Sequence, residues 1–225
     1  MVPTTGVTSF LTGIHLLLVG AGVTAGISIV AICLGFLFAS LVCVACMSRS
    51  RPLRFAGEVY VSFFRGVPLL IQLLVLYYLL PFIGLDLPPV VAGTLGLALC
   101  TSAYQAENLR GGLLTIPAGQ EEAARAFGYN VVQRWTRILL PQALRLSMPM
   151  IVNEMIAILK ASSLVSVVGI TDLTRVSQNI VARNFQPIQW YATAALFYLA
   201  INLVLSYFSR VAGRRLGRSH SGAML

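Results

Sequence analysis

Long apolar runs separated by short polar segments constrain this chain more than any other feature. The runs cover residues 20–46, 55–82, 90–109, 143–170 and 190–211. Each is long enough to cross a bilayer as a helix, which takes about 20 residues, whereas a barrel strand takes only about 10. Backbone groups inside hydrocarbon find no water, so helices must satisfy their own hydrogen bonds. We therefore expect an all-α integral membrane protein with five transmembrane helices.

The composition supports the membrane class. Hydrophobic residues make up 57% of the 225 positions and charged residues only 10%, whereas soluble domains average about 25% charged residues. The formal net charge of +9 could indicate nucleic acid, but no nucleic-acid fold signature accompanies it. The basic residues lie between the apolar runs, as in membrane proteins with positive cytoplasmic loops. We expect contact with membrane lipid and none with nucleic acid.

The arginines indicate which side of the membrane each loop occupies. With five spans, one side collects thirteen arginines and the other only Arg175 and Arg183. The side rich in arginine is expected to be cytoplasmic, which puts the N-terminus outside and the C-terminus inside. Three regions follow: a periplasmic or interfacial segment (1–19), a transmembrane domain (20–211) with a cytoplasmic loop (110–142), and a basic cytoplasmic tail (212–225). The outer connection, residues 171–189, contains Asp172 and is expected to be a solvated loop.

The segment from Pro117 to Pro141 is a polar, charged island between two apolar runs. Residues 119–127 are rich in Ala, Glu, Gln and Arg, which favour a helix, and Gly128 is placed to end it. Asn130 can cap a second helix, which we expect to run until Pro141 interrupts its hydrogen bonds. Two short helices at an angle on the membrane surface have a shape that can insert into a partner.

The island also resembles a known signature. Glu122-Ala123-Ala124, Gly128, Ile138 and Leu140-Pro141 match the EAA loop, E-A-A-x3-G-x9-I-x-L-P, of permease subunits in binding-protein-dependent ABC importers. Three further segments resemble the branch that imports polar amino acids of the histidine, glutamine and arginine type. They are residues 60–73, 103–112 and 140–145. The resemblance covers about residues 20–211.

This resemblance implies a type I ABC importer permease fold in the bacterial inner (cytoplasmic) membrane, with several spans. The loop would dock into a groove on a cytoplasmic ATPase, and closure of the ATPase dimer would move the spans. The coupling residues it implies are Glu121, Glu122, Ala123, Ala124, Arg125, Gly128, Leu140 and Pro141. The implied partners are two ABC ATPase subunits, a second permease subunit (identical or homologous), an extracytoplasmic substrate-binding protein and a polar, possibly basic, amino acid.

The chain itself is not expected to be an enzyme. Its single lysine, Lys160, has no glycine-rich phosphate loop around it. The two histidines, His15 and His220, lie too far apart in sequence to suggest a metal cluster. We therefore expect no cofactor or metal bound by this chain, and ATP and Mg in the partner ATPase. A membrane-bound enzyme would need converging catalytic groups, which the island does not provide.

Polar residues inside the spans are candidates for the substrate path, because placing a charge in hydrocarbon costs about 3 kcal/mol or more. The candidates are Glu154, Asn153, Gln72, Tyr104, Glu107, Ser162 and Ser163. Glu154 is the preferred one, since a carboxylate can meet an amino group; alternatively it pairs with Lys160 or Arg145 and only fixes packing. Glu107 could equally pair with Arg110, one helical turn away.

The substrate region also departs from the family pattern. Relatives usually read Lys-Asp-Thr-Ser-Leu where this chain has Lys160-Ala161-Ser162-Ser163-Leu164, so the acidic position is missing. An ATP-independent secondary amino acid transporter is the main alternative function. It predicts inverted repeats and acidic relays within the membrane, and we find neither pattern in the sequence.

Overall fold

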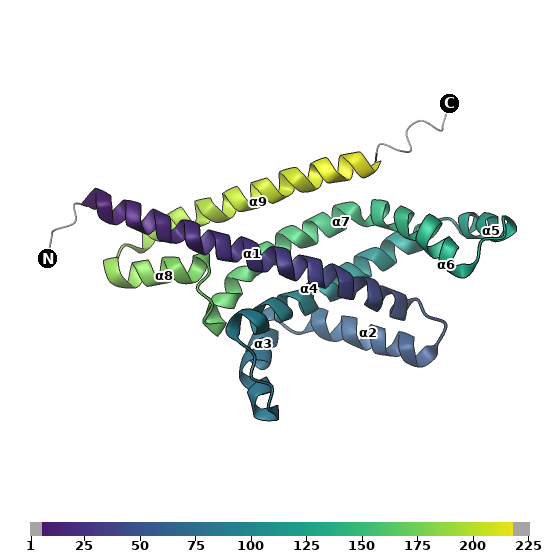
Figure 1. The fold of residues 1–225 in the computed structure, drawn as a ribbon, viewed down its shortest axis with the longest axis horizontal. Helices are drawn as coiled ribbons and strands as arrows, with labels where there is room; N and C mark the ends of the chain where they lie inside the picture. The colour runs from purple at the N-terminus through teal and green to yellow at the C-terminus, as the bar shows by residue number, and fades with distance from the viewer. Residues whose placement is uncertain (1–5, 218–225) are drawn as a thin grey trace.

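The computed structural model describes residues 6–217, and all regular secondary structure in that range is helical. Figure 1 shows an elongated bundle with one short arm, α3, that stands away from the rest. The helices are α1 (Gly6–Cys46), α2 (Arg51–Gly66), α3 (Leu69–Leu74), α4 (Pro89–Leu114), α5 (Ala118–Ala126), α6 (Val131–Arg134), α7 (Leu140–Ala161), α8 (Leu173–Asn184) and α9 (Pro187–Gly217). Wider π-helical turns cover Val75–Leu79 and Trp135–Leu139, and tighter 3-10 turns cover Leu80–Ile83 and Ser162–Val168.

The centre of the bundle is the pair α1 and α4, with α7 against α4 on the other side. Small residues let these helices approach closely. A Cβ added at Gly35 of α1 would lie 2.2 Å from Thr101 Cγ2 and 3.0 Å from the Ala98 oxygen of α4. The largest apolar cluster joins α1 and α4 to the end of α7 and the 3-10 turn after it, around Ala31, Leu97 and Val165.

Three helical stretches are long and apolar enough to cross a membrane, or four if the bent pair α2–α3 counts as one span. The expected count of five is therefore not confirmed within the described residues. The expected span that does not meet this criterion is α4, whose buried positions include Thr94, Thr101, Ser102 and Gln105. A helix enclosed by other helices need not be apolar all round, so its sequence is less hydrophobic than that of a lipid-facing span.

Two expected boundaries differ from the structure. The structure shows no break at residue 19, because α1 runs unbroken from Gly6 to Cys46; the interfacial role expected for the segment before residue 20 stays a prediction. The predicted break at residues 65–68 is confirmed, but it lies in the middle of the second run rather than near its start. There α2 and the segment Leu69–Ile83 meet at 105°. Pro68 has no N–H to continue the ladder of α2, which explains the position of the bend.

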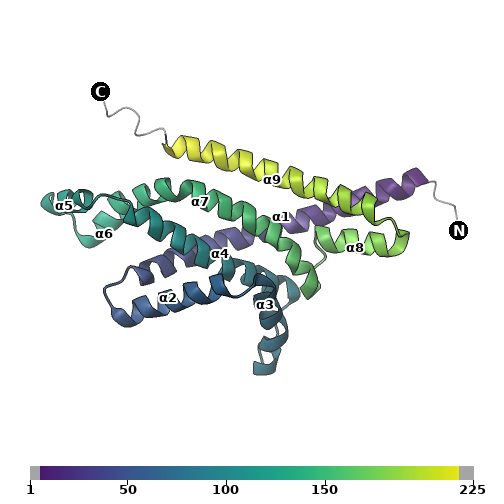
Figure 2. The same cartoon turned by 180° about the vertical axis from the view of Figure 1, so that it is seen from behind.

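The two ends of the elongated molecule carry different elements. The N-terminal end of α1 lies with α8 at one end, as Figures 1 and 2 show from opposite sides. The loop helices α5 and α6, the connection between α1 and α2, and the C-terminal part of α9 lie toward the other end. The start of α1 and the end of α9 are therefore far apart. Which end faces the cytoplasm stays a prediction.

Candidate functional site

The polar island forms the helix–turn–helix that its sequence predicts. The helix α5 ends at Ala126, and Gly128 follows with φ of +75°, a left-handed conformation that favours glycine. Asn130 then caps α6: its side-chain oxygen accepts a hydrogen bond from the Gln133 backbone N–H at 2.9 Å. In return the Gln133 side chain accepts one from the Asn130 backbone N–H at 3.0 Å. This reciprocal capping box fixes the angle between the two helices.

The expectation that Pro141 ends the second helix is wrong. The chain continues from α6 through the π-helical turn Trp135–Leu139 into α7, so that Val131–Val168 forms one stretch of 38 residues. Within the turn, the backbone N–H of Leu140 bonds to the oxygen of Trp135, five residues back. This change of bonding pattern places Pro141 in the first turn of α7, where a missing N–H is tolerated.

The predicted coupling residues fall into three groups. Glu122 is exposed, and no described residue forms an ion pair with it, whereas Glu121 pairs with Arg125 one turn away. That guanidinium lowers the pKa of the Glu121 carboxyl below its ordinary value. Ala124 packs inward and Ala123 faces outward. Leu140 and Pro141 belong to the first turn of α7 rather than to the surface of α5.

Apolar side chains are also exposed on this loop. Phe127 is 83% exposed and Val132 is 68% exposed, at the turn between α5 and α6 and on α6 itself. Sequence reasoning did not single them out, although an apolar residue beside a helix-ending glycine was a usable signal. We call these two side chains and Glu122, all exposed on the loop, the docking face.

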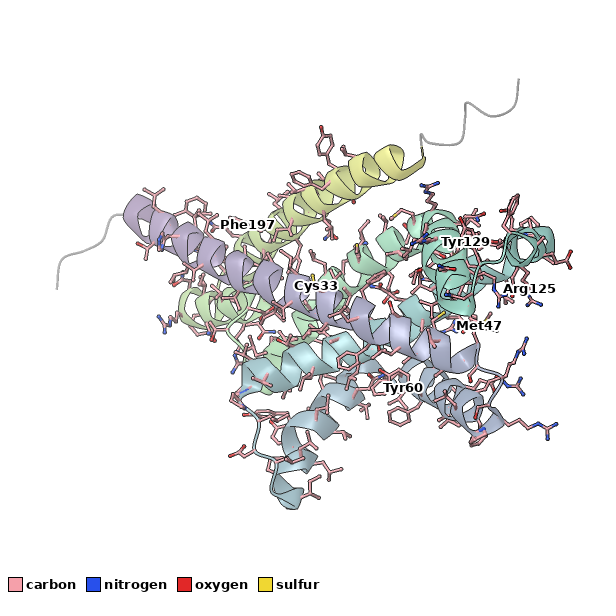
Figure 3. All side chains as sticks on the ribbon, turned by 45° about the vertical axis from the view of Figure 1, so that its right-hand side comes forward. Cys33, Met47, Tyr60, Arg125, Tyr129 and Phe197 are labelled. Carbon is pink, nitrogen blue, oxygen red and sulfur yellow. The ribbon has the colours of Figure 1, made fainter. Side chains whose placement is uncertain are left out.

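A groove of about 570 Å³ lies between the loop and the end of α1. We call it the loop groove. Its walls come from the C-terminal part of α1, the residues after it, the end of α4 and the helices α5 and α6, with Met47 and Arg125 both among the lining residues. Figure 3 labels both residues at this end of the molecule.

The preferred path residue, Glu154, is half-buried on α7 and lies near Thr101 of α4. It does not pair with Lys160, which is exposed and lines a separate groove between α7 and α9. Asn153 is exposed beside it. Ser162 and Ser163 use their hydroxyls within their own helical segment, bonding the backbone oxygens three residues before them.

The remaining path candidates have partners that the sequence only partly indicated. Glu107 forms an ion pair with Arg110, as its spacing allows, and Arg65 Nη1 lies 4.0 Å from Glu107 Oε2. The Arg65 guanidinium also lies 5.3 Å from the ring centre of Tyr104. Glu107 is thus already compensated by two arginines, whereas Glu154 forms no ion pair with another described residue.

Gln72 stabilises the bend between α2 and α3. Its side-chain amide donates to the backbone oxygens of Phe64 at 3.0 Å and Val67 at 2.8 Å. These carbonyls belong to the last turn of α2 and its C-terminal cap, which lose their helical partners at the break. The amide therefore satisfies backbone groups, a role that differs from the path role expected from its sequence position.

Residues 9–218, nearly the whole chain, match the family described as binding-protein-dependent transport system inner membrane component. The chain belongs to this family. It is an inner-membrane permease of the ABC importers that carry amino acids, with several apolar helices. The resemblance that the loop motif indicated is confirmed.

Two curated relatives and one solved structure illustrate the similarity. The permease is 37% identical over 196 residues to the L-cystine transport system permease protein of Bacillus subtilis (strain 168), covering 87% of this chain and 84% of the relative. It is 34% identical over 205 residues to the glutamine transport system permease protein of Escherichia coli (strain K12), covering 90% and 94%. A crystal structure of an amino acid ABC transporter with histidines matches with a TM-score of 0.84 and 32% identity, covering 94% of this chain and 99% of that chain.

One buried polar network of the permease was not predicted. Asp172 is not in a solvated loop: it is fully buried and caps α8, accepting hydrogen bonds from the backbone N–H groups of Thr174 and Arg175. The Tyr198 hydroxyl of α9 donates to Asp172 Oδ2 at 3.3 Å, and Thr24 Oγ1 of α1 accepts from the Leu173 N–H at 3.0 Å. Three helices are therefore tied together. An Asp just before a segment with helical periodicity is a helix-start signal, and it could have predicted the capping role of Asp172.

Proposed function

We propose that this permease forms, with a second permease subunit, the membrane path for a polar amino acid, and that its loop 110–142 couples this path to a separate ATPase. The region 20–211 is then the transmembrane domain, and the arginine-rich end, with the loop, faces the cytoplasm. The N-terminus is outside and the C-terminus, with its basic tail, inside. This assignment places the docking face where a soluble ATPase can reach it.

The observation that carries the proposal is the continuous helical stretch Val131–Val168. It begins at the docking face, beside Val132, and includes Glu154 in its second half. A helix transmits displacement along its axis because its backbone hydrogen bonds make it stiff, and this stretch stays helical past Pro149, where one such bond is missing. Movement of the loop by a partner therefore moves Glu154 relative to Thr101 on α4, which is the connection that a coupled transporter needs.

The substrate assignment rests on charge. Glu154 is the path carboxylate that no arginine pairs with directly among the described residues. A half-buried carboxylate beside a hydroxyl can accept hydrogen bonds from the α-ammonium group of an amino acid, or from a cationic side chain. The relatives carry names of polar amino acid systems, which agrees with this class. Two ATPase subunits, holding ATP and Mg, and an extracytoplasmic substrate-binding protein complete the proposed importer.

The test is purification of the tagged permease from native membranes in a mild detergent, with mass spectrometry of the proteins that accompany it. We expect a soluble-type ATPase with a Walker A motif in about equal amount. Glu122→Arg should remove it, because the substitution reverses the charge of the docking face. Glu58→Arg is the matched control: it reverses an exposed glutamate on α2 that pairs only with Arg54.

The alternative, an ATP-independent secondary transporter, makes the opposite prediction. The permease would then purify alone, remain stable, and move amino acid in liposomes without ATP. Uptake in cells would persist after ATP depletion while the ion gradient is intact. That result would replace the coupling proposal. Retention of the ATPase by Glu122→Arg, with loss on Glu58→Arg, would instead move the docking surface away from the loop.

A further inference from the structure

The loop groove contains more positive charge than its own residues compensate. Three arginines line it, Arg49 after α1, Arg125 on α5 and Arg134 at the end of α6, against a single carboxylate, Glu121. Arg125 is paired with that carboxylate. Arg49 and Arg134 form no ion pair with any described residue. Two guanidinium groups that line one recess without an ion-pair partner among the described residues make it a suitable place for an anion from outside the chain.

Geometry and electrostatics agree that these groups converge. Arg49 and Arg134 both contribute to lowering the pKa of Glu121, so both guanidinium charges lie close enough to influence the Glu121 carboxylate. The Nε of Arg134 is buried and has no hydrogen-bond partner. A buried donor left unpaired is unfavourable, and an acceptor oxygen in the groove would satisfy it. A planar guanidinium matches a phosphate or carboxylate better than a single point charge does.

The apolar part of the lining narrows the choice of ligand. Val44 belongs to the last turns of α1 and Leu113 to the last turn of α4, so the groove opens along helices of the bundle. Trp135 also lines it, and tryptophan favours the level of the headgroups. A free phosphate or a soluble acidic segment gains nothing from these walls. A lipid has an anionic head for the arginines and an apolar body for the walls.

We propose that the loop groove binds the phosphate headgroup of an anionic phospholipid from the cytoplasmic leaflet. The proposal rests on the proposed function only for orientation, because the arginine-rich end must face that leaflet. The groove shares no lining residue with the docking face (Glu122, Phe127 and Val132), although Glu121 and Arg125, two of the expected coupling residues, line it. The lipid therefore lies behind the loop and supports it from the membrane side, while the ATPase contacts its outer surface.

The experiment uses the full-length permease with the subunits that copurify. It is placed in nanodiscs of phosphatidylcholine with or without phosphatidylglycerol, and native mass spectrometry measures the lipid retained. The test variant is Arg49→Gln with Arg134→Gln. The matched control is Arg51→Gln with Arg137→Gln, which removes the same charge from the same two segments, at positions outside the lining. Circular dichroism and thermal unfolding verify that both double variants are folded.

We expect wild type and control to retain phosphatidylglycerol in preference to phosphatidylcholine. The test variant should bind phosphatidylglycerol about twenty-fivefold more weakly, about fivefold for each arginine. Equal retention of both lipids by wild type would overturn the proposal, and that comparison needs no variant. An equal loss in the control would also overturn it, since the effect would then be general surface charge.

Two further arms separate the other sources of negative charge. Inorganic phosphate that displaces phosphatidylglycerol at comparable concentration would identify a free-phosphate site instead. Purified ATPase subunit that displaces the lipid would make the groove part of the ATPase interface, and the proposal would fail. In contrast, Glu122→Arg should lose the ATPase and keep the lipid. Loss of the proposed coupling is thereby distinguishable from loss of the lipid site.

Discussion

Glu154 is the residue whose chemistry the transport proposal uses most directly. Replacing it with Gln keeps the shape and removes the charge. Hydrogen bonds to charged groups contribute about 1.5–3 kcal/mol, so ATP-driven uptake of a polar amino acid should fall by at least about tenfold, with the ATPase still bound. Glu58→Gln, an exposed change on α2, is the control. Radiolabelled uptake measures the effect, and unchanged uptake would assign Glu154 to packing alone.

Gly112 sets how closely α4 and α7 approach. A Cβ added there would lie 2.0 Å from Ser147 Oγ and 2.7 Å from the Ala143 oxygen. Gly112→Ala must therefore push α7 away, and overpacking of this kind costs about 1–3 kcal/mol. At Gly111 an added Cβ meets nothing within 4 Å. Gly111→Ala should be neutral, or stabilise by up to about 1 kcal/mol through helix propensity. Thermal unfolding in detergent compares them, and equal midpoints would contradict the close contact.

At the scale of helices, the stretch Val131–Val168 must be stiff between the loop and Glu154. Leu146 lies in this interval and is 50% exposed, so it can be changed with little loss of packing. Leu146→Gly and Leu146→Ala both shorten the side chain, but glycine also weakens the helix by about 0.5–1 kcal/mol relative to alanine. We expect Leu146→Gly to lower substrate-stimulated ATP hydrolysis more than Leu146→Ala, with ATPase binding retained. Identical hydrolysis rates would show that stiffness here is not needed.

Elements with local chemical signals were predictable from the sequence. Gly128 needs a positive φ, Asn130 and Gln133 cap each other, and Pro68 cannot continue a helix; all three follow from the residues themselves. For this reason the helices of the loop and the bend in the second run were expected where they occur, within a few residues.

Elements that depend on tertiary contacts were not predictable. Pro141 normally ends a helix, but the π-helical turn before it changes the bonding pattern. Asp172 looked solvated because nothing in its own segment shows that Tyr198 and Thr24 enclose it. The count of three or four apolar stretches falls below the five expected spans for a related reason, since α4 owes its polar positions to burial between neighbours.

At the scale of the whole molecule, the open question is how the bundle crosses the membrane. Gln178 on α8 and Gln120 on α5 are both exposed and lie toward opposite ends. In a variant in which Cys33, Cys43, Cys46 and Cys100 are replaced, we introduce Gln178→Cys or Gln120→Cys. A membrane-impermeant maleimide should label the first in intact cells and the second only after permeabilisation. The reverse pattern would invert the proposed orientation, and labelling of both in intact cells would contradict the separation of the two ends.

The wide turn at Trp135–Leu139 also has a rotational consequence. An α-helix turns by about 100° per residue, and a π-helical turn accommodates one residue more than an α-helical turn. The residues on the loop side of this turn are therefore rotated about the helix axis, relative to Glu154, by the angle of about one residue, roughly 100°. Counting positions along an ideal helix would give the wrong azimuth for Val132. A permease lacking one residue here would aim its loop in a different direction, even if it kept every residue of the loop motif.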